Sequence, residues 1–175
     1  MIVYQTETLE QAWKELVPLV VAYWKESEPQ WHYQGLNMSY ARYAEYERAG
    51  MLHCVTVRDD CVMVGYALGY ISDSMRSQAK MWADDMFYIA PKYRGLSIGH
   101  GLMDFVEEYC RSTGIVEIFL NGRANSSVPK MLEHVDYTLV SMQYSKRLSR
   151  ADSASPPLAV LESPPNGKAQ GPADP

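Results

Sequence analysis

The sequence predicts an α/β domain, and three observations support this fold class. Residues 52–71 alternate apolar and polar side chains with a period of two, which is typical of paired strands. Residues 98–112 repeat apolar side chains at the spacing of one helical face. The length of 175 residues is enough for one domain with a buried core. In chain order we expect strands at 1–5, 52–58, 62–71, 81–90, 115–121 and 137–147, and helices at 8–26, 40–49, 98–112 and 126–135.

The expected elements begin, end or bend at residues whose backbone chemistry suits such a point. Pro18 interrupts the first helix, so we expect either a kink or two short helices. Ser39 is expected to cap the second helix and Gly50 to end it. In the strand at 62–71, Gly65 and Gly69 weaken the pattern and predict a bend or a bulge.

Charge and hydropathy limit the classes of partner. The formal net charge is −5, which argues against a nucleic-acid partner, because binding one requires many phosphates to be neutralised. No apolar run approaches the roughly 18 residues of a membrane-spanning helix. The first residues lack the basic and then apolar pattern of a secretion signal. We therefore expect a cytoplasmic protein with no membrane contact.

The cysteines and histidines are not spaced as metal ligands. Cys54 and Cys110 lie in apolar patterns and are expected to be buried, reduced thiols. The four histidines show no H-x-x-x-H spacing, and the cysteines show no C-x-x-C spacing. We therefore expect no structural metal site.

The composition changes near residue 149. Residues 149–175 hold six of the ten prolines together with Ser, Gly and Ala, and they contain few large apolar side chains. Such a segment cannot bury enough apolar surface to offset the entropy of ordering it. We expect a folded domain at 1–148 followed by a disordered tail at 149–175.

Residues 86–101 read MFYIAPKYRGLSIGHG and have the form of a phosphate-binding turn. Pro91 ends the preceding strand, because it has no amide hydrogen for the ladder. Gly95, Gly99 and Gly101 follow, the last two at the start of the expected helix at 98–112. The turn amides, the positive end of the helix dipole and the Arg94 guanidinium all favour a phosphate here. The stretch matches neither the P-loop nor the dinucleotide-binding fingerprint.

A longer pattern resembles motif A of the GNAT family of N-acetyltransferases: Ile89-Ala90-Pro91-Lys92-Tyr93-Arg94-Gly95-x-x-Ile98-Gly99-x-Gly101-Leu102. Ser97 stands where the family usually has its first core glycine. If that position needs a positive φ, serine costs about 1 kcal/mol relative to glycine. A later segment also resembles the family pattern, and the resemblance covers roughly residues 1–147: Asn125-x-x-Val128-x-x-Met131-Leu132-Glu133-x-x-Asp136-Tyr137.

The resemblance implies a mixed sheet of six or seven strands flanked by about four helices, whose fourth and fifth strands splay apart at motif A. It also implies acetyl-CoA as the cofactor. The pantetheine arm would lie in the splay along the fourth strand, and the pyrophosphate would lie on the turn. The cofactor-binding residues implied in this way are Phe87, Tyr88, Ile89, Arg94, Gly95, Leu96, Ser97, Ile98, Gly99, His100, Gly101 and Asn125.

Asp85 is the candidate general base, because family members often carry a carboxylate four residues before the last apolar residue of this strand. Simple alternation would place Asp85 on one face with Phe87 and Ile89, and Asp84 on the other. The alternative is that both carboxylates are solvated at the start of the strand. Leu132 stands where the family has its usual tyrosine acid. Tyr144 or Tyr88 would then supply the proton, or the thiolate would leave unassisted.

An aromatic cluster is the candidate acceptor site. Trp24, Trp31, His32 and Tyr33 lie at or after the end of the first predicted helix, and aromatic rings can bind an alkylammonium through cation–π contacts. The alternative is that these rings only pack the helix pair onto the sheet.

The sequence thus predicts an acetyl-CoA-dependent N-acetyltransferase that acts on a primary amine of a protein or a small molecule. The chain further resembles small bacteriophage-encoded members of the family, which would place it in the host cytoplasm. A monomer or a homodimer is expected. The alternative function is a catalytically weak or inactive GNAT-fold module that binds coenzyme A or a partner protein, motivated by Ser97, Leu132 and the tail.

Overall fold

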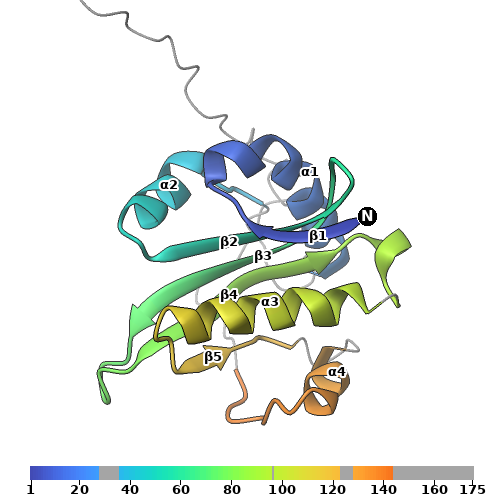
Figure 1. The fold of residues 1–175 in the computed structure, drawn as a ribbon. Helices are drawn as coiled ribbons and strands as arrows, with labels where there is room; N and C mark the ends of the chain where they lie inside the picture. The colour runs from blue at the N-terminus through green and yellow to red at the C-terminus, as the bar shows by residue number, and fades with distance from the viewer. Residues whose placement is uncertain (28–35, 96, 123–127, 144–175) are drawn as a thin grey trace, which may run out of the picture.

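The computed structural model describes residues 1–27, 36–95, 97–122 and 128–143 (Figure 1). Within these ranges five strands form one sheet in the order β1-β2-β3-β4-β5. Strands β1 to β4 are antiparallel to their neighbours, and β5 is parallel to β4. The elements are β1 Ile2–Thr6, α1 Leu9–Ser27, α2 Tyr40–Arg48, β2 Leu52–Asp59, β3 Val62–Asp73, β4 Lys80–Ile89, η1 Pro91–Tyr93, α3 Ile98–Ser112, β5 Glu117–Phe119 and α4 Val128–His134.

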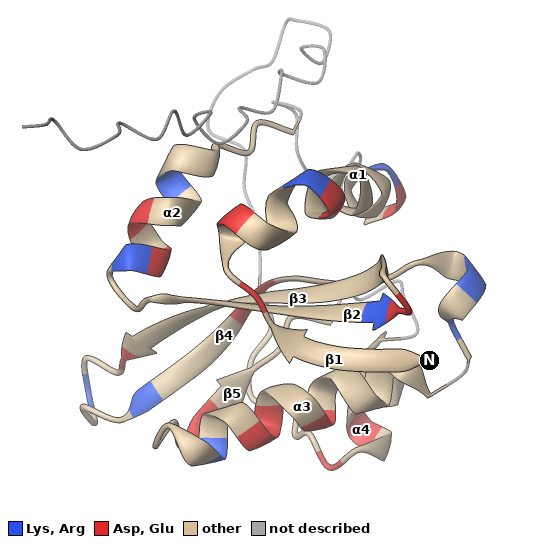
Figure 2. Ribbon diagram, turned by 45° about the horizontal axis from the view of Figure 1, so that its top comes forward, with Lys and Arg blue, Asp and Glu red and all other residues tan. Residues whose placement is uncertain are grey.

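The sheet is covered on both faces, with α1 and α2 on one face and α3 on the other (Figure 1). Each face buries its own apolar cluster: Leu9, Leu16 and Tyr66 belong to the cluster under α1, and Trp82 and Leu102 to the cluster under α3. Charged residues concentrate on the helices and the strand ends, while β3 is largely uncharged (Figure 2). The mixed α/β architecture expected from the sequence is confirmed.

Helix α1 runs without interruption from Leu9 to Ser27, so the expectation of two short helices at Pro18 is wrong. The buried positions Ala12, Leu16 and Val20 hold one face of the helix against the sheet. Pro18 is on the exposed side. The Lys14 carbonyl that loses its amide donor is therefore accessible to water, which lowers the cost of the proline.

Helix α2 begins at the predicted Tyr40 and ends at Arg48, one residue before the predicted end. Ser39 is its N-cap, although the serine side chain makes no capping hydrogen bond. At the other end, Gly50 has a φ of +69°. The Gly50 amide donates to the Glu47 carbonyl at 2.9 Å, and the Met51 amide donates to the Tyr46 carbonyl at 2.8 Å. These two bonds form a Schellman motif, which explains the glycine.

The bulge expected near Gly69 is present, and its extra residue lies on β4. Leu68 pairs with Met86 while Gly69 pairs with Asp84, so Asp85 has no partner in the register. A Cβ atom on Gly69 would lie only 2.0 Å from the Trp82 ring. The glycine therefore lets the indole pack directly against the β3 backbone.

Strands β4 and β5 part soon after they meet. Their pairing joins Met81–Ala83 to Glu117–Phe119 and goes no further among the described residues. Strand β5 is accordingly shorter than the predicted 115–121. Beyond the last pair, the Asn121 amide and side chain both donate to the Asp84 carboxylate, at 2.8 and 2.7 Å. Among the residues that the structure describes, the remainder of β4 therefore has no strand partner on this side and presents an open edge.

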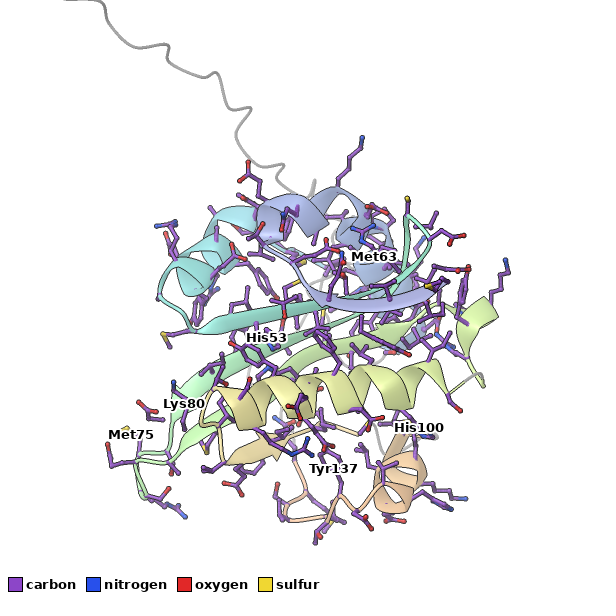
Figure 3. All side chains as sticks on the ribbon, in the orientation of Figure 1. His53, Met63, Met75, Lys80, His100 and Tyr137 are labelled. Atoms are coloured by element: carbon purple, nitrogen blue, oxygen red, sulfur yellow. The ribbon has the colours of Figure 1, made fainter. Side chains whose placement is uncertain are left out.

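The predicted last strand at 137–147 is not formed over residues 137–143. After α4, Asp136 adopts a φ of +63°, and the Tyr137 amide donates to the Leu132 carbonyl at 3.0 Å. The Tyr137 hydroxyl then donates to Glu107 on α3 at 3.1 Å, and Figure 3 shows this side chain directed toward that helix. These contacts hold the start of the segment against α4 and α3. The described residues thus contain five strands rather than six or seven, and the predicted tail at 149–175 lies outside them.

Candidate active site

The turn after β4 has the backbone shape that the motif requires. Pro91–Tyr93 form a short 3-10 helix, Gly95 has a φ of +77°, and α3 starts at Ile98. Ser97 caps α3 with φ +58° and ψ 9°, in the left-handed region. The position where the family usually has glycine thus does need a positive φ, and serine occupies it at a cost in stability.

The two glycines of the first turn of α3 serve different purposes. A Cβ atom on Gly99 would meet nothing within 4 Å, so the backbone there borders open space. A Cβ atom on Gly101 would lie 2.4 Å from the Tyr4 hydroxyl oxygen. Gly101 therefore lets β1 approach α3, whereas Gly99 leaves room beside a helix N-terminus. That open room, together with the amides of the turn, fits the pyrophosphate of coenzyme A.

The Arg94 side chain turns back onto the protein. Its Nε donates to the Ile89 carbonyl at 2.9 Å, and a terminal nitrogen pairs with Glu26 on α1 at 2.7 Å. The guanidinium also lies over the Tyr88 ring, 5.2 Å from its centroid. The arginine therefore fixes the turn to β4 and α1, and Glu26 offsets much of the positive charge that the sequence assigned to the turn.

The open edge of β4 carries the backbone groups of Phe87 and Ile89. The Ala90 amide donates to the Val64 carbonyl on β3 at 2.9 Å. Because backbone hydrogen-bonding groups alternate in direction along a strand, those of Phe87 and Ile89 point to the opposite edge, beyond the last β5 pair. An extended ligand can bond to this edge as an additional strand would.

Asp85 lies on the face opposite to the one predicted. The bulge at Asp85 breaks the alternation of β4, so Phe87 and Ile89 pack in the cluster under α3, while Asp85 faces α2. There its Oδ2 accepts a hydrogen bond of 2.6 Å from the Tyr43 hydroxyl. Tyr70 on β3 lies close enough to lower the pKa of this carboxyl as well. The alternative of a solvated strand-start residue does not describe this partly buried group.

The surroundings of Asp85 suit a proton acceptor. Burial raises the pKa of this carboxyl above its ordinary value, and the Tyr43 and Tyr70 hydroxyls lower it in part. The result is a carboxylate more basic than a solvated aspartate. Burial also raises the pKa of Tyr43, as does the neighbouring Asp85 charge, so the tyrosine stays protonated and keeps donating.

Of the two tyrosines considered as proton donors, Tyr88 and Tyr144, only Tyr88 lies within the described residues. The Tyr88 hydroxyl donates to Glu26 at 2.8 Å, and burial followed by this hydrogen bond raises the pKa of Tyr88 to about 12. Leu132, in the place of the usual tyrosine, is a buried residue of α4. Tyr144 lies outside the described residues, as do Leu96 and Asn125.

The predicted acceptor cluster is described only in part. Trp24 is partly buried and packs against the apolar cluster under α1, which agrees with a packing role. Trp31, His32 and Tyr33 lie outside the described residues. His100, predicted for the cofactor, is exposed in the first turn of α3 (Figure 3). Ile98, two positions earlier, is buried.

Sequence patterns did not identify three residues of the site. Tyr43 and Glu26 reach β4 and its turn from separate helices, 42 and 62 residues away along the chain. Asn121 bonds Asp84 from the end of β5. The one signal in the sequence was the recurrence of tyrosines around Tyr43. Their spacing was already explained by one face of a helix, so it did not indicate a contact with Asp85.

Two further observations concern the described residues as a whole. No helix among them is long and apolar enough to cross a membrane. No group of three His, Cys, Asp or Glu side chains in the described part of the chain is arranged to hold a metal ion. Cys54 and Cys110 are buried free thiols, as predicted.

Structural comparison finds acetyltransferases with this fold, all at low sequence identity. The ribosomal-protein-alanine N-acetyltransferase of Brucella melitensis is 18% identical, with a TM-score of 0.65, over 85% of this chain and 100% of that one. The glucosamine-6-phosphate N-acetyltransferase of Arabidopsis thaliana is 14% identical, with a TM-score of 0.65, over 85% and 99%. An aminoglycoside acetyltransferase from an uncultured soil sample is 10% identical, with a TM-score of 0.70, over 85% and 99%.

Sequence comparison assigns the family. No curated protein matches the sequence. The model of the acetyltransferase (GNAT) family matches residues 13–129, which include β4, its turn, α3 and β5. Together with the splayed strands and the glycine-bearing turn, this match shows that the chain belongs to the GNAT acetyltransferase family, whose enzymes take the acetyl group from acetyl-CoA.

Proposed function

We propose that this protein transfers an acetyl group from acetyl-CoA to a primary amine of a protein or a small molecule. The observation that carries the proposal is the parting of β4 and β5 beyond Ala83, next to a turn with left-handed backbone at Gly95 and Ser97. This places an open strand edge beside a helix N-terminus, which suits a long ligand with a phosphate at one end.

The chain supplies positions for the donor along this edge. Acetyl-CoA, when bound, supplies an activated thioester whose carbonyl carbon an amine can attack. The Ile89 amide faces the open edge and is the candidate donor to the thioester oxygen. The Phe87 backbone can bond the pantetheine arm, and the amides near Gly99 can bond the pyrophosphate. Arg94 holds this turn against Ile89 and Glu26.

Asp85 is the proposed general base. An amine is protonated at neutral pH, and its nitrogen lone pair is not available until a proton leaves. The Asp85 carboxylate can accept that proton directly or through one water molecule, which breaks an N–H bond and forms an O–H bond. Its raised pKa makes this transfer easier than it would be for a solvated aspartate.

The chain offers no tyrosine at the usual place of the general acid, because Leu132 is there and is buried. Tyr88 is a poor substitute, since its hydroxyl already donates to Glu26. Tyr144 stays a prediction from the sequence. The departing thiolate would otherwise take its proton from solvent.

The acceptors named for the structural neighbours support an amine acceptor here. The structural neighbours named above act on a ribosomal-protein alanine, an amino sugar phosphate and aminoglycosides, according to their names. All of these acceptors are amines, which supports an amine here. A cytoplasmic location, a bacteriophage origin, and a monomeric or homodimeric state stay predictions from the sequence.

The binding half of the proposal is tested by calorimetric titration with acetyl-CoA. Gly99→Leu should abolish the heat of binding, because its side chain would enter the open room beside the turn without touching the protein. Ser112→Leu at the other end of α3 is the matched control and should bind normally. Unchanged binding by the Gly99→Leu protein, at a normal melting temperature, would contradict the placement.

The transfer half is tested on a panel of small amines, aminoglycosides and lysine-containing peptides, with release of the free thiol as the signal. The proposal predicts turnover on at least one class. Binding without turnover on any of them would instead favour the inactive module, which no observation on the described residues supports at present.

A further inference from the structure

The Asp85 carboxylate is held by a tyrosine from a different layer of the molecule. Tyr43 reaches it from α2, and the hydroxyl oxygen lies 2.6 Å from Asp85 Oδ2. The two residues are 42 positions apart in the sequence, so no local pattern brings them together. The β4 bulge is what turns Asp85 toward α2. A short bond of this kind to an ionised acceptor is among the stronger hydrogen bonds in proteins.

The remaining groups around Asp85 offer it little electrostatic compensation. From β3, the Tyr70 and Tyr66 side chains lie near the carboxylate. On β4 itself, Asp84 is a second negative charge nearby. Neither a lysine nor an arginine pairs with Asp85 among the described residues. Tyrosine hydroxyls are therefore the groups that offset the cost of burying this charge.

Tyr43 is itself fixed in place by packing. Its ring lies 6.4 Å from the Trp13 ring of α1, centroid to centroid, and it joins the apolar cluster under α1. The hydroxyl stays protonated, because burial and the Asp85 charge both disfavour the tyrosinate. The Tyr43 hydroxyl is thus held in place by helix packing that does not depend on its hydrogen bond to Asp85.

We propose that Tyr43 is a positioning residue for acetyl transfer: its hydroxyl holds the Asp85 carboxylate toward the α1/α2 face and stabilises the ionised form that accepts the amine proton. A carboxylate has about four lone-pair sites, so Asp85 can keep its hydrogen bond from Tyr43 and still take a proton. This inference rests on the proposed function, since Asp85 is the general base there.

The kinetic test compares Tyr43→Phe with the parent over a pH series. The variant keeps the ring but loses the donor, so the Asp85 pKa should rise and the acid limb of kcat/KM should move up by about one pH unit. Tyr40→Phe is the matched control, because Tyr40 lies on the same helix and contacts Trp13 edge-to-face at 5.1 Å. In the Tyr40→Phe control, the acid limb of kcat/KM should stay at the same pH as in the parent.

A second readout does not need activity. The side-chain carboxyl carbon of Asp85, followed by NMR in the free protein, reports the same titration. Its midpoint should rise in Tyr43→Phe, rise also in Tyr70→Phe, and stay unchanged in Tyr40→Phe. If the parent transfers no acetyl group, the proposed function fails, while this titration still decides whether Tyr43 stabilises the ionised carboxylate.

The outcomes separate positioning from mere packing. Equal upward shifts of the kinetic limb and the carboxyl titration would support the inference. A lower melting temperature and lower activity with neither midpoint displaced would overturn it, because a packing role moves stability but not the Asp85 pKa. An unchanged titration midpoint in both Tyr43→Phe and Tyr70→Phe would overturn it as well.

Discussion

The two faces of the sheet bury different chemistry. Under α1 and α2, the carboxylates of Glu7 and Asp85 are bonded by side-chain donors. Under α3 the buried surface is almost wholly apolar, and the polar atoms Trp82 Nε1 and His53 Nδ1 have no partner among the described residues. Figure 3 shows His53 between the sheet and α3, where its ring stacks on Tyr109 at 3.5 Å. Asp85 faces α2, while the unpaired edge of β4 runs toward β5. Under the proposed function, proton transfer and cofactor binding would therefore use different sides of β4.

The largest effect should follow from changing Asp85. Asp85→Asn removes the proton acceptor and should lower kcat/KM at least about 100-fold, with little change in the Kd for acetyl-CoA. Steady-state kinetics and calorimetry measure the two quantities. Asp104→Asn, an exposed carboxylate of α3, is the control and should retain activity. If the Asp85→Asn protein turned over substrate as fast as the parent, Asp85 would not be the general base.

The α3 face should be the more sensitive to added volume. Gly69→Ala places a methyl group 2.0 Å from the Trp82 ring, which is itself fully buried. Overpacking of this kind lowers the free energy of unfolding by about 3 kcal/mol, measured by urea denaturation. The matched Gly99→Ala change meets open space and should instead stabilise α3 by up to about 1 kcal/mol. Equal stability of both variants would contradict the packing described here.

The α1/α2 face should be the more sensitive to acid through Glu7. Burial opposes ionisation of Glu7, but bonds from Arg58, Thr56 and Gln5 lower its pKa to about 2 from an ordinary 4.5. Because the folded-state pKa is depressed, the stabilisation is present above about pH 4.5 and is lost as the pH falls toward 2. Glu7→Gln should therefore cost about 2 kcal/mol at pH 7 and almost nothing near pH 2.

Urea denaturation at the two pH values measures this difference. Glu45→Gln on the exposed surface of α2 is the control and should change stability little at either pH. A cost of Glu7→Gln that does not depend on pH would show that the carboxylate charge contributes nothing.

The smallest effect concerns the turn. Ser97 has a φ of +58°, so Ser97→Gly should raise the free energy of unfolding by about 1 kcal/mol. Ser112→Gly, in the last turn of the same helix, should lower it instead, because glycine is unfavourable within a helix. A destabilised Ser97→Gly variant would mean that the serine side chain is required at the turn.

Sequence reasoning succeeded where one local pattern controls the structure. Helix α3 has the predicted bounds because its apolar period is regular. The motif spacing identified Ser97 as the position to examine for a positive φ, and the structure supplies that φ. It failed at Asp85, because a count of alternating residues does not reveal an inserted bulge residue. It also missed the pairing of Arg94 with Glu26, since the two are 68 residues apart and meet only when α1 packs beside the turn.

The central claim is that acetyl-CoA binds between β4 and β5, with Asp85 within reach of the thioester carbonyl. A crystal structure of the complex with acetyl-CoA tests it most directly. We predict the thioester oxygen within hydrogen-bond distance of the Ile89 amide, the pyrophosphate beside Gly99, and Asp85 no more than one bridging water from the site of attack. A cofactor bound elsewhere, or an Asp85 carboxylate closed off from the thioester by the sheet, would contradict the account.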